Sequence, residues 1–252
     1  MQRVLLLGGT TEASDMAQAL ARAGVPAVFS YAGRTEAPLE QPLPTRVGGF
    51  GGVPGLCSYL VAERITHVID ATHPFAAQMS QHALQACGEL GLPLLALERP
   101  PWQAQSGDRW QHVPDLAAAL AALPSHPARV FLAIGRQHVQ AFLDADLHWY
   151  LLRLVDPGFD VPTTRGAVVI DRGPFTLEND LALLRQHRIS HVVAKNAGGV
   201  GAAAKLAAAR ELGYPVILVN RPALPHRHTV GTVQQAMQWL GATAVHEAER
   251  GV

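Results

Sequence analysis

The sequence has few of the features that mark secreted, membrane-bound or nucleic-acid-binding proteins. Its 252 residues include two cysteines, Cys57 and Cys87, which cannot form the disulfide framework of a secreted domain. Neither charge is in excess, because 20 Lys and Arg residues balance 20 Asp and Glu residues. We therefore expect no nucleic-acid partner, which would require a basic surplus to neutralise phosphates.

Long apolar runs are also lacking. No stretch approaches the roughly 18 residues of a membrane span, so we expect no membrane partner. The apolar run that begins at Val4 is four residues long, too short for the apolar core of a signal peptide. A cytoplasmic location is the expectation.

The sequence does contain enough apolar residues for a large buried core. Hydrophobic residues make up 48% of the chain, which excludes a largely disordered protein. The length fits one large domain or two small ones. The sequence favours an α/β protein, because short apolar runs alternate with stretches of helical spacing.

The first thirty residues predict one strand–helix–strand unit. Residues 4–7 are a continuous apolar run, typical of a strand that is buried on both faces of a parallel sheet. A Gly-Gly-Thr-Thr turn follows, and residues 12–23 have helical spacing before Gly24. Residues 26–31 supply the second strand. The same alternation then predicts further strands near 46–47, 67–70, 94–97 and 110–113, and helices over 53–63, 75–90 and from Asp115.

The two halves of the chain resemble each other. The segment at 64–69, Arg-Ile-Thr-His-Val-Ile, returns 124 residues later as Arg-Ile-Ser-His-Val-Val at 188–193. In both halves a helix and a Glu-Leu-Gly-x-Pro segment follow. We predict two Rossmann-like open parallel-sheet domains of similar topology with a cleft between them. The Pro-rich segment 124–127 is the candidate linker, giving a cofactor-binding domain over 1–125 and a substrate-binding domain over 126–252.

The turn after the first strand is a candidate dinucleotide site. In open parallel sheets, ligands bind beyond the carboxyl ends of the strands. Glycines allow a pyrophosphate to approach the backbone, and the helix start provides the positive end of the dipole. The turn lacks the second and third glycines of the usual motif, so a ligand-free turn is the alternative. The candidate cofactor residues here are Gly8, Gly9, Thr10, Thr11 and Glu12.

The end of the second strand favours NADPH over NADH. Where an NAD site usually has Asp or Glu, this chain has Ser30, Gly33 and Arg34, which suit a 2′-phosphate. A solvated arginine is the alternative. The glycine-dense stretch 47–55, with Gly51, is either a further wall of the cofactor site or a surface loop.

A third strand end has the sequence Asp-Ala-Thr-His-Pro-Phe-Ala at 70–76. Ala71 and Thr72 would lie near the same cofactor, and Thr72 could bond its ribose or carboxamide. His73 could orient the substrate or donate a proton. Its alternative role is in helix capping or packing.

Basic residues follow several other strands of this neutral protein. They favour an anionic ligand between the domains, although each cation alone could equally be a surface charge. The candidate substrate-binding residues are His73, Arg99, Arg136, Lys195, Asn196 and Arg221. No metal-ligand spacing is present, and the His-Arg-His segment at 226–228 has no partner, so we expect no metal.

Taken together, these motifs resemble the precorrin-6A reductases of cobalamin biosynthesis. The most specific is the Asp-Ala-Thr-His-Pro-Phe-Ala run, and the motifs extend in order from residue 8 to residue 222. The chain departs from the family after Lys195, where a small hydroxyl residue is expected and Asn196 stands. The other motifs are Gly-Gly-Thr-Thr-Glu-Ala at 8–13, Tyr-Ala-Gly-Arg at 31–34, Gly-Phe-Gly-Gly at 49–52, Arg-Pro-Pro-Trp at 99–102, Lys-Asn-Ala-Gly-Gly at 195–199 and Asn-Arg-Pro at 220–222.

This resemblance implies NADPH-dependent reduction of the tetrapyrrole precorrin-6A to precorrin-6B, with hydride delivered at the C18–C19 double bond. A cobalt-containing analogue serves the anaerobic pathway. The basic residues would bind the substrate's carboxylates. Two other functions remain open: a non-catalytic NADPH-binding or redox-sensing module, and an S-adenosylmethionine-dependent methyltransferase, against which Arg34 argues. The oligomeric state is open, and a monomer fits the sequence.

Overall fold

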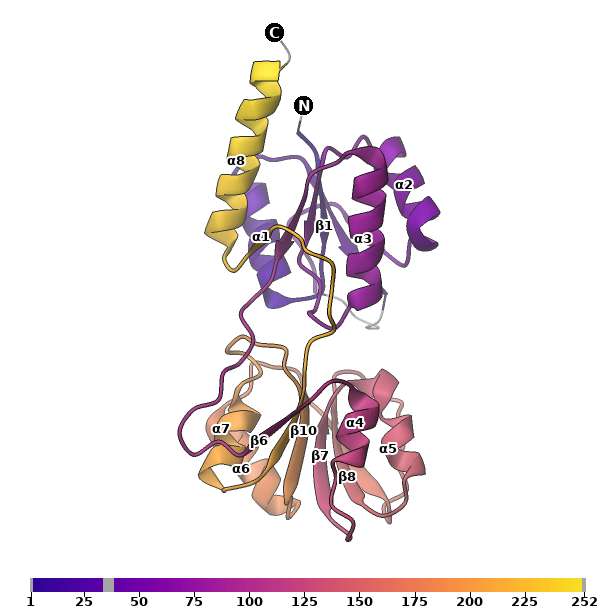
Figure 1. Ribbon diagram of the computed structural model, residues 1–252, viewed down its shortest axis with the longest axis vertical. Helices are drawn as coiled ribbons and strands as arrows, with labels where there is room; N and C mark the ends of the chain where they lie inside the picture. The colour runs from indigo at the N-terminus through magenta and orange to yellow at the C-terminus, as the bar shows by residue number, and fades with distance from the viewer. Residues whose placement is uncertain (1, 34–38, 251–252) are drawn as a thin grey trace. The chain divides into compact units, whose positions relative to one another are not determined.

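The protein folds into two α/β units, seen here in a computed structural model that describes residues 2–33 and 39–250 (Figure 1). The first unit contains residues 1–100 and 223–252, and the second contains residues 101–222. Each unit is built on one six-stranded sheet in which all the paired strands run parallel. The predicted fold class of two open parallel-sheet domains is confirmed.

The first sheet has the strand order β12-β5-β4-β1-β2-β3, which is the order of a Rossmann sheet. Its strands are β1 (Val4–Leu7), β2 (Ala27–Tyr31), β3 (Thr45–Val47), β4 (His67–Asp70), β5 (Leu94–Leu97) and β12 (Thr229–Val230). Its helices are α1 (Thr11–Arg22), α2 (Gly52–Ala62), α3 (Ala77–Leu90) and α8 (Val233–Arg250).

Helices cover both faces of this sheet, which explains the continuous apolar run of β1. On one face Leu6 packs with residues of α1 and α8, including Met16 and Leu240. On the other face Leu5 packs with residues of α2 and α3, including Leu60. Figure 1 shows the same arrangement, with α1 and α8 on one side of the sheet and α2 and α3 on the other. A strand buried on both faces has no polar alternation, as the sequence predicts.

The second sheet has the equivalent order, β6-β11-β10-β7-β8-β9. Its strands are β6 (Trp110–Val113), β7 (Arg129–Ala133), β8 (Trp149–Leu154), β9 (Gly166–Ile170), β10 (His191–Lys195) and β11 (Val216–Val219). Its helices are α4 (Leu116–Ala121), the 3₁₀ turn η1 (Arg136–His138), α5 (Gln140–Asp144), α6 (Leu177–Gln186) and α7 (Ala204–Glu211).

The two halves exchange their sixth strands. After β5 the chain leaves the first unit, and β6 pairs with β11 in the second sheet. After β11 the chain returns, and β12 pairs with β5 in the first sheet. The division of the chain therefore differs from the expected 1–125 and 126–252. Residues 124–127, the expected linker, connect α4 to β7 inside the second unit.

The internal repeat is visible in the hydrogen bonds of the two units. Arg64 and Arg188 have the same left-handed backbone conformation, each with φ of 50°. The hydroxyl of Thr66 bonds Nδ1 of His67 at 2.8 Å, and the hydroxyl of Ser190 bonds Nδ1 of His191 at 2.9 Å. The sequence echo thus marks equivalent positions at the amino ends of β4 and β10.

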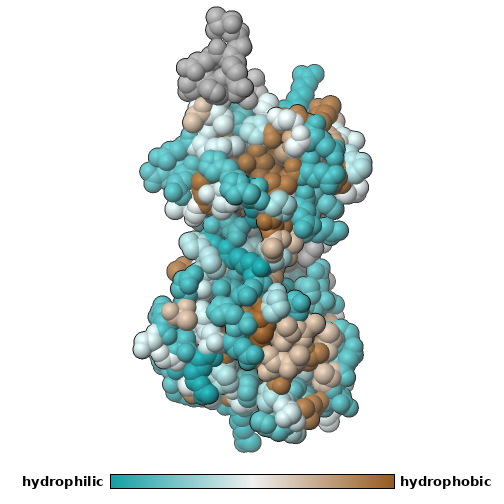
Figure 2. All heavy atoms as spheres, viewed as in Figure 1, coloured by the Kyte–Doolittle hydropathy of each residue, from teal (hydrophilic) through white to brown (hydrophobic). Residues whose placement is uncertain are grey.

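Hydrophilic residues cover most of the face shown in Figure 2. Within residues 2–33 and 39–250, none of the helices has the length and hydropathy needed to cross a membrane.

Candidate functional site

The carboxyl ends of β1 and β4 meet at the point where the strand order of the first sheet reverses, which is where open α/β sheets bind ligands. Thr10 joins the two strand ends. Its hydroxyl donates to the carbonyl of Ala71 at 2.8 Å and accepts from the amide of Ala13 at 3.1 Å, so it also caps α1. The turn after β1 is thereby fixed against the turn after β4.

The two glycines of the first turn have different roles. A Cβ on Gly8 would overlap the ring of Phe29, so Gly8 serves close packing within the unit. Gly9 has φ of +121°, and a Cβ there would meet nothing within 4 Å. The turn therefore presents open space and bare backbone beside the start of α1, as a pyrophosphate site requires.

Ser30, at the end of β2, is hydrogen-bonded to an arginine of β3. Nη1 of Arg46 donates to the hydroxyl of Ser30 at 2.8 Å and to the carbonyl of Gly48 at 2.9 Å. Its guanidinium lies 3.8 Å from the ring centroid of Phe50. Burial lowers the pKa of Arg46, and Tyr59 acts in the opposite sense. Hydroxyl and guanidinium together form a cationic corner beside the glycine-rich segment that includes Gly51.

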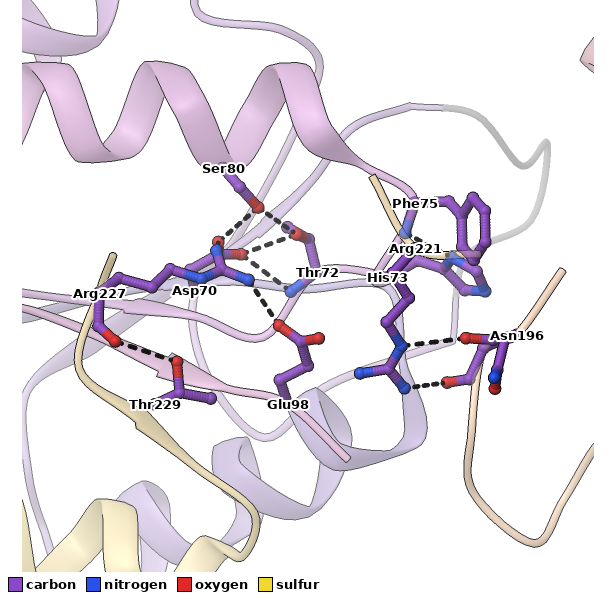
Figure 3. A network of polar contacts seen from close by, with 11 residues as sticks. Asp70, Thr72, His73, Phe75, Ser80, Glu98, Asn196, Arg221, Arg227 and Thr229 are labelled. Atoms are coloured by element: carbon purple, nitrogen blue, oxygen red, sulfur yellow. Dashed lines mark hydrogen bonds and ion pairs between the residues drawn. The ribbon is translucent and has the colours of Figure 1, made fainter. Parts of the chain in front are cut away.

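A network of polar side chains holds the end of β4 in place (Figure 3). Asp70 is 3% exposed. One of its carboxylate oxygens accepts from the amide and the hydroxyl of Thr72 at 3.1 and 2.7 Å, and the other accepts from Ser80 at 2.6 Å. Arg227, on the returning segment, pairs with Asp70 at 2.7 Å and with Glu98 at 2.5 Å. The network fixes Thr72 and the segment that precedes β12.

His73 is oriented by its own turn. The amide of Phe75 donates to Nδ1 of His73 at 3.2 Å, and the two rings lie 5.8 Å apart. In the neutral ring, an Nδ1 that accepts a hydrogen bond leaves the proton on Nε2. Nε2 is thus the nitrogen from which His73 can donate a proton.

Glu12, in the first turn of α1, is paired with Arg99. Nη1 of Arg99 lies 2.6 Å from Oε2 of Glu12. The side chain of Arg99 is 16% exposed and that of Glu12 is 22% exposed. Glu12 is an acidic side chain next to the proposed pyrophosphate position, so the pair reduces the repulsion that its carboxylate would exert. Arg99 thus belongs to the first unit and is engaged there.

The remaining candidates lie at the carboxyl end of the second sheet. Arg136 is exposed and its Nη2 donates to the carbonyl of Gly158 at 2.8 Å. The amide side chain of Asn196 bonds the backbone of Trp102 through both of its polar atoms, at 2.7 and 3.2 Å. Arg221 donates to the carbonyls of Asn196 and Ala197 at 2.9 and 3.1 Å (Figure 3), so it supports the loop that follows Lys195.

The structure therefore gathers the predicted site residues at two sheet edges. One group lies at the carboxyl end of the first sheet: Gly8, Gly9, Thr10, Thr11, Glu12, Ser30, Gly33, Gly51, Ala71, Thr72, His73 and Arg99. The other group lies at the carboxyl end of the second sheet: Arg136, Lys195, Asn196 and Arg221. Arg34 lies outside the described residues.

Sequence reasoning missed two arginines of this site. Arg46 faces Ser30 because β2 and β3 pair in that register, and nothing local in the sequence indicates this pairing. Arg227 stands in the His-Arg-His segment at 226–228, where nothing local in the sequence indicates its ion pairs with Asp70 and Glu98. Groups of three or more His, Cys, Asp or Glu residues that could hold a metal ion are absent from the part of the chain that the structure describes.

Comparison with known proteins identifies the family. Residues 3–241 match the family described as Precorrin-6x reductase CbiJ/CobK. The chain belongs to the precorrin-6x reductase family. It is 63% identical to a precorrin-6A reductase of Rhodobacter capsulatus over 247 residues, covering 96% of this chain and 98% of that protein. It is 44% identical to one of Rhodococcus erythropolis, with 96% and 98% covered.

A solved structure agrees with this family assignment. The structure titled CobK precorrin-6A reductase superposes with a TM-score of 0.91 at 62% sequence identity, covering 96% of this chain and 97% of that chain. The matches to the precorrin-6x reductase family span both units, so the exchanged strands and both sheet edges lie within the region compared.

Proposed function

We propose that this chain reduces precorrin-6A to precorrin-6B in cobalamin biosynthesis, with NADPH as the reductant. The observation that supports this most is the junction of β1, α1 and β4 at the strand-order reversal of the first sheet, in a chain of the precorrin-6x reductase family. NADPH supplies the hydride, which goes to the C18–C19 double bond of the tetrapyrrole. The chain's own part is binding, orientation and charge.

The residues of the first unit fit a phosphorylated dinucleotide. The open backbone at Gly9 and the capped start of α1 would hold the pyrophosphate. Ser30 and Arg46 would bind the 2′-phosphate, together with the Arg34 that the sequence indicates. Among the described residues, no carboxylate forms an ion pair with Arg46, so its charge is not already neutralised. Ala71 and Thr72 would contact the rest of the cofactor.

The tetrapyrrole's carboxylates need cationic partners. Arg136 and Lys195 would bind them directly, since both stand at strand ends of the second sheet. Arg221 and Asn196 would act mainly by holding the loop after Lys195 and the backbone of Trp102. His73 would orient the substrate or donate a proton from Nε2, because its ring is fixed through Nδ1.

Parallel fluorescence titrations with NADPH, NADH and S-adenosylmethionine test the cofactor assignment. We expect NADPH to bind more tightly than NADH, and S-adenosylmethionine not to bind. Binding of S-adenosylmethionine alone would overturn the proposal in favour of a methyltransferase. Binding of NADPH that stays unoxidised when precorrin-6A is added would favour the non-catalytic module.

A further inference from the structure

A cavity of about 450 Å³ lies at the amino end of the second sheet. It is formed by residues at the amino ends of four neighbouring strands, β7, β8, β9 and β10. The candidate substrate residues of this unit stand at the opposite, carboxyl end of the same sheet. The cavity is therefore separate from the site described above. Its lining includes Arg129, Arg165, Arg188 and His148.

Positive charge is concentrated in this cavity. Three arginines line it together with a single acidic residue, Asp146. No ion pair joins any of these three arginines to a carboxylate within residues 2–33 and 39–250. The guanidinium of Arg129 stacks 3.5 Å from the ring centroid of Trp149 and donates through Nε to the carbonyl of His187 at 2.5 Å. Burial and the charge of Arg188 lower the pKa of Arg129.

Two buried nitrogen atoms of the lining lack a hydrogen-bond partner. His148 is 7% exposed, and its Nδ1 has no partner. Nε of Arg165 is also buried and unpaired. Buried polar groups are normally hydrogen-bonded. Both side chains therefore keep unused hydrogen-bonding capacity in the wall of the cavity.

The first unit shows what neutralises the equivalent position. There Arg3 corresponds to Arg129. The carbonyl of Arg3 accepts from the amide of Thr66, just before β4, at 2.9 Å. The carbonyl of Arg129 accepts from the amide of Ser190, just before β10, at the same distance. Arg3 pairs with Glu63 at 2.5 Å. Arg64 and Arg188 are equivalent positions. The residue before Arg64 is Glu63, and the residue before Arg188 is His187. The second unit thus has the arginine without the carboxylate.

The second unit also has less helical cover at this end. In the first unit α8 reaches the start of β4, where Thr243 bonds Nε2 of His67 at 3.0 Å. The helix that follows the exchanged strand of the second unit is α4, which has 6 residues against 18 in α8. At about 1.5 Å of rise per residue, α4 is too short to cover the corresponding edge.

We propose that this cavity binds a dianionic phosphate group. Three arginines and one aspartate leave a net charge of about +2, which matches a phosphate dianion better than a single carboxylate. Guanidinium groups bind phosphate oxygens through paired hydrogen bonds. The group is either free inorganic phosphate or the phosphate of a monoester. This inference concerns neither NADPH nor the tetrapyrrole, so it does not depend on the proposed function.

Isothermal titration calorimetry on the full chain tests the proposal, with inorganic phosphate and glycerol 3-phosphate titrated separately at chloride-matched ionic strength. His187→Glu restores the carboxylate that the first unit has, and we expect it to weaken phosphate binding about tenfold or more. Arg188→Asn removes one guanidinium with a residue that tolerates positive φ, and should weaken binding similarly. If both ligands bind equally well, inorganic phosphate alone is sufficient to occupy the cavity. If glycerol 3-phosphate binds more tightly, the ligand of the cavity is a phosphate monoester.

Two control variants separate this site from other sources of phosphate binding. Arg185→Gln removes an exposed arginine near the same helix end and should leave binding unchanged. Arg46→Gln removes the other proposed phosphate-binding corner, in the first unit, and the binding that His187→Glu and Arg188→Asn weaken should persist in it. The proposal is overturned if neither ligand binds the wild-type chain at millimolar concentration. It is equally overturned if His187→Glu and Arg188→Asn bind as wild type does, or if Arg46→Gln alone abolishes binding.

Discussion

Ser30 and Arg46 come from neighbouring strands, and Nη1 of Arg46 donates to the Ser30 hydroxyl at 2.8 Å. Ser30 follows a clear apolar strand, so its place at the sheet edge could be predicted. Arg46 stands in a three-residue strand among prolines and glycines, and its contact with Ser30 exists because β2 and β3 pair in one register. Gly9 and Thr10 were predictable, because a turn and a helix cap are local features. Contacts set by strand pairing are not local.

The Ser30–Arg46 corner predicts cofactor selectivity. Arg46→Gln should weaken NADPH binding about 10–100-fold through loss of a charge-assisted hydrogen bond, and should leave NADH binding nearly unchanged. Arg46→Lys keeps the charge and should recover part of the loss. Fluorescence titration measures both cofactors, with Arg22→Gln on the exposed end of α1 as the matched control. An equal loss for NADPH and NADH would show that Arg46 supports the fold rather than the 2′-phosphate.

Three histidines of the second unit predict a pH dependence of stability. Burial lowers the pKa of His148, His187 and His191. Nearby groups lower each pKa further: His126 acts on His148, and Arg129 acts on His187. His126, His148 and Arg109 act on His191. The unfolded chain therefore binds more protons than the folded chain just below about pH 6.5. The free energy of unfolding should fall as pH drops through that value.

Urea unfolding at pH 7.5 and 5.5 in phosphate-free buffer measures this effect. Tryptophan fluorescence reports mainly on the second unit, which holds Trp102, Trp110 and Trp149. His148→Gln should reduce the difference between the two pH values, and exposed His226→Gln should not. The same pH difference in wild type and His148→Gln would contradict the assignment.

At the scale of elements, most helices and strands were predictable because their signals are local. The strand predicted at 110–113 coincides with β6, and Asp115, where a helix is predicted to begin, is the N-cap of α4. The predicted helix over 75–90 begins two residues late, at Ala77, because residues 73–76 form a turn in which the amide of Ala76 donates to the carbonyl of His73. Element ends depend on such turn bonds, which composition does not reveal.

The cap of α1 predicts a coupling between stability and cofactor binding. Thr10→Ala should lower the free energy of unfolding by about 1 kcal/mol, because the cap of α1 is lost. It should also weaken NADPH binding, because Thr10 ties the turn after β1 to Ala71. Thr10→Ser should retain both properties. Urea unfolding and NADPH titration measure the two effects.

A second cap serves as the control for Thr10. Asp115 accepts from the amide of Ala118 at 2.8 Å at the start of α4, in the other unit. Asp115→Ala should cost similar stability and leave NADPH binding unchanged. If Thr10→Ala lost stability alone, the turn would have no part in the cofactor site.

For the whole molecule, the repeat in the sequence predicts two units of one topology, but not the exchange of their sixth strands. β6 and β12 are edge strands, and each pairs with a strand more than a hundred residues away. Their short patterns show where strands exist without showing which sheet they join. The boundary expected at residue 125 fails for this reason.

Fragments test the exchanged topology. Residues 101–222 contain all six strands of the second sheet, so this fragment should unfold cooperatively. Residues 1–125 lack β12 and α8. Because Ala236 and Leu240 of α8 are buried in the core of the first unit, the fragment 1–125 should not unfold cooperatively. Residues 1–100 mixed with the peptide 223–252 should recover a cooperative transition. Circular dichroism during urea unfolding measures all three, and cooperative folding of 1–125 alone would contradict the exchange.

Hydride transfer from NADPH to precorrin-6A is the most direct test of the proposed reaction. Precorrin-6A is incubated with the full chain and NADPH that carries deuterium at both positions of nicotinamide C4, and the tetrapyrrole is analysed by mass spectrometry. We expect one deuterium atom in each product molecule and one NADPH oxidised per tetrapyrrole reduced. A reduced product without deuterium, or NADPH that stays unoxidised beside unchanged precorrin-6A, would contradict the reductase assignment.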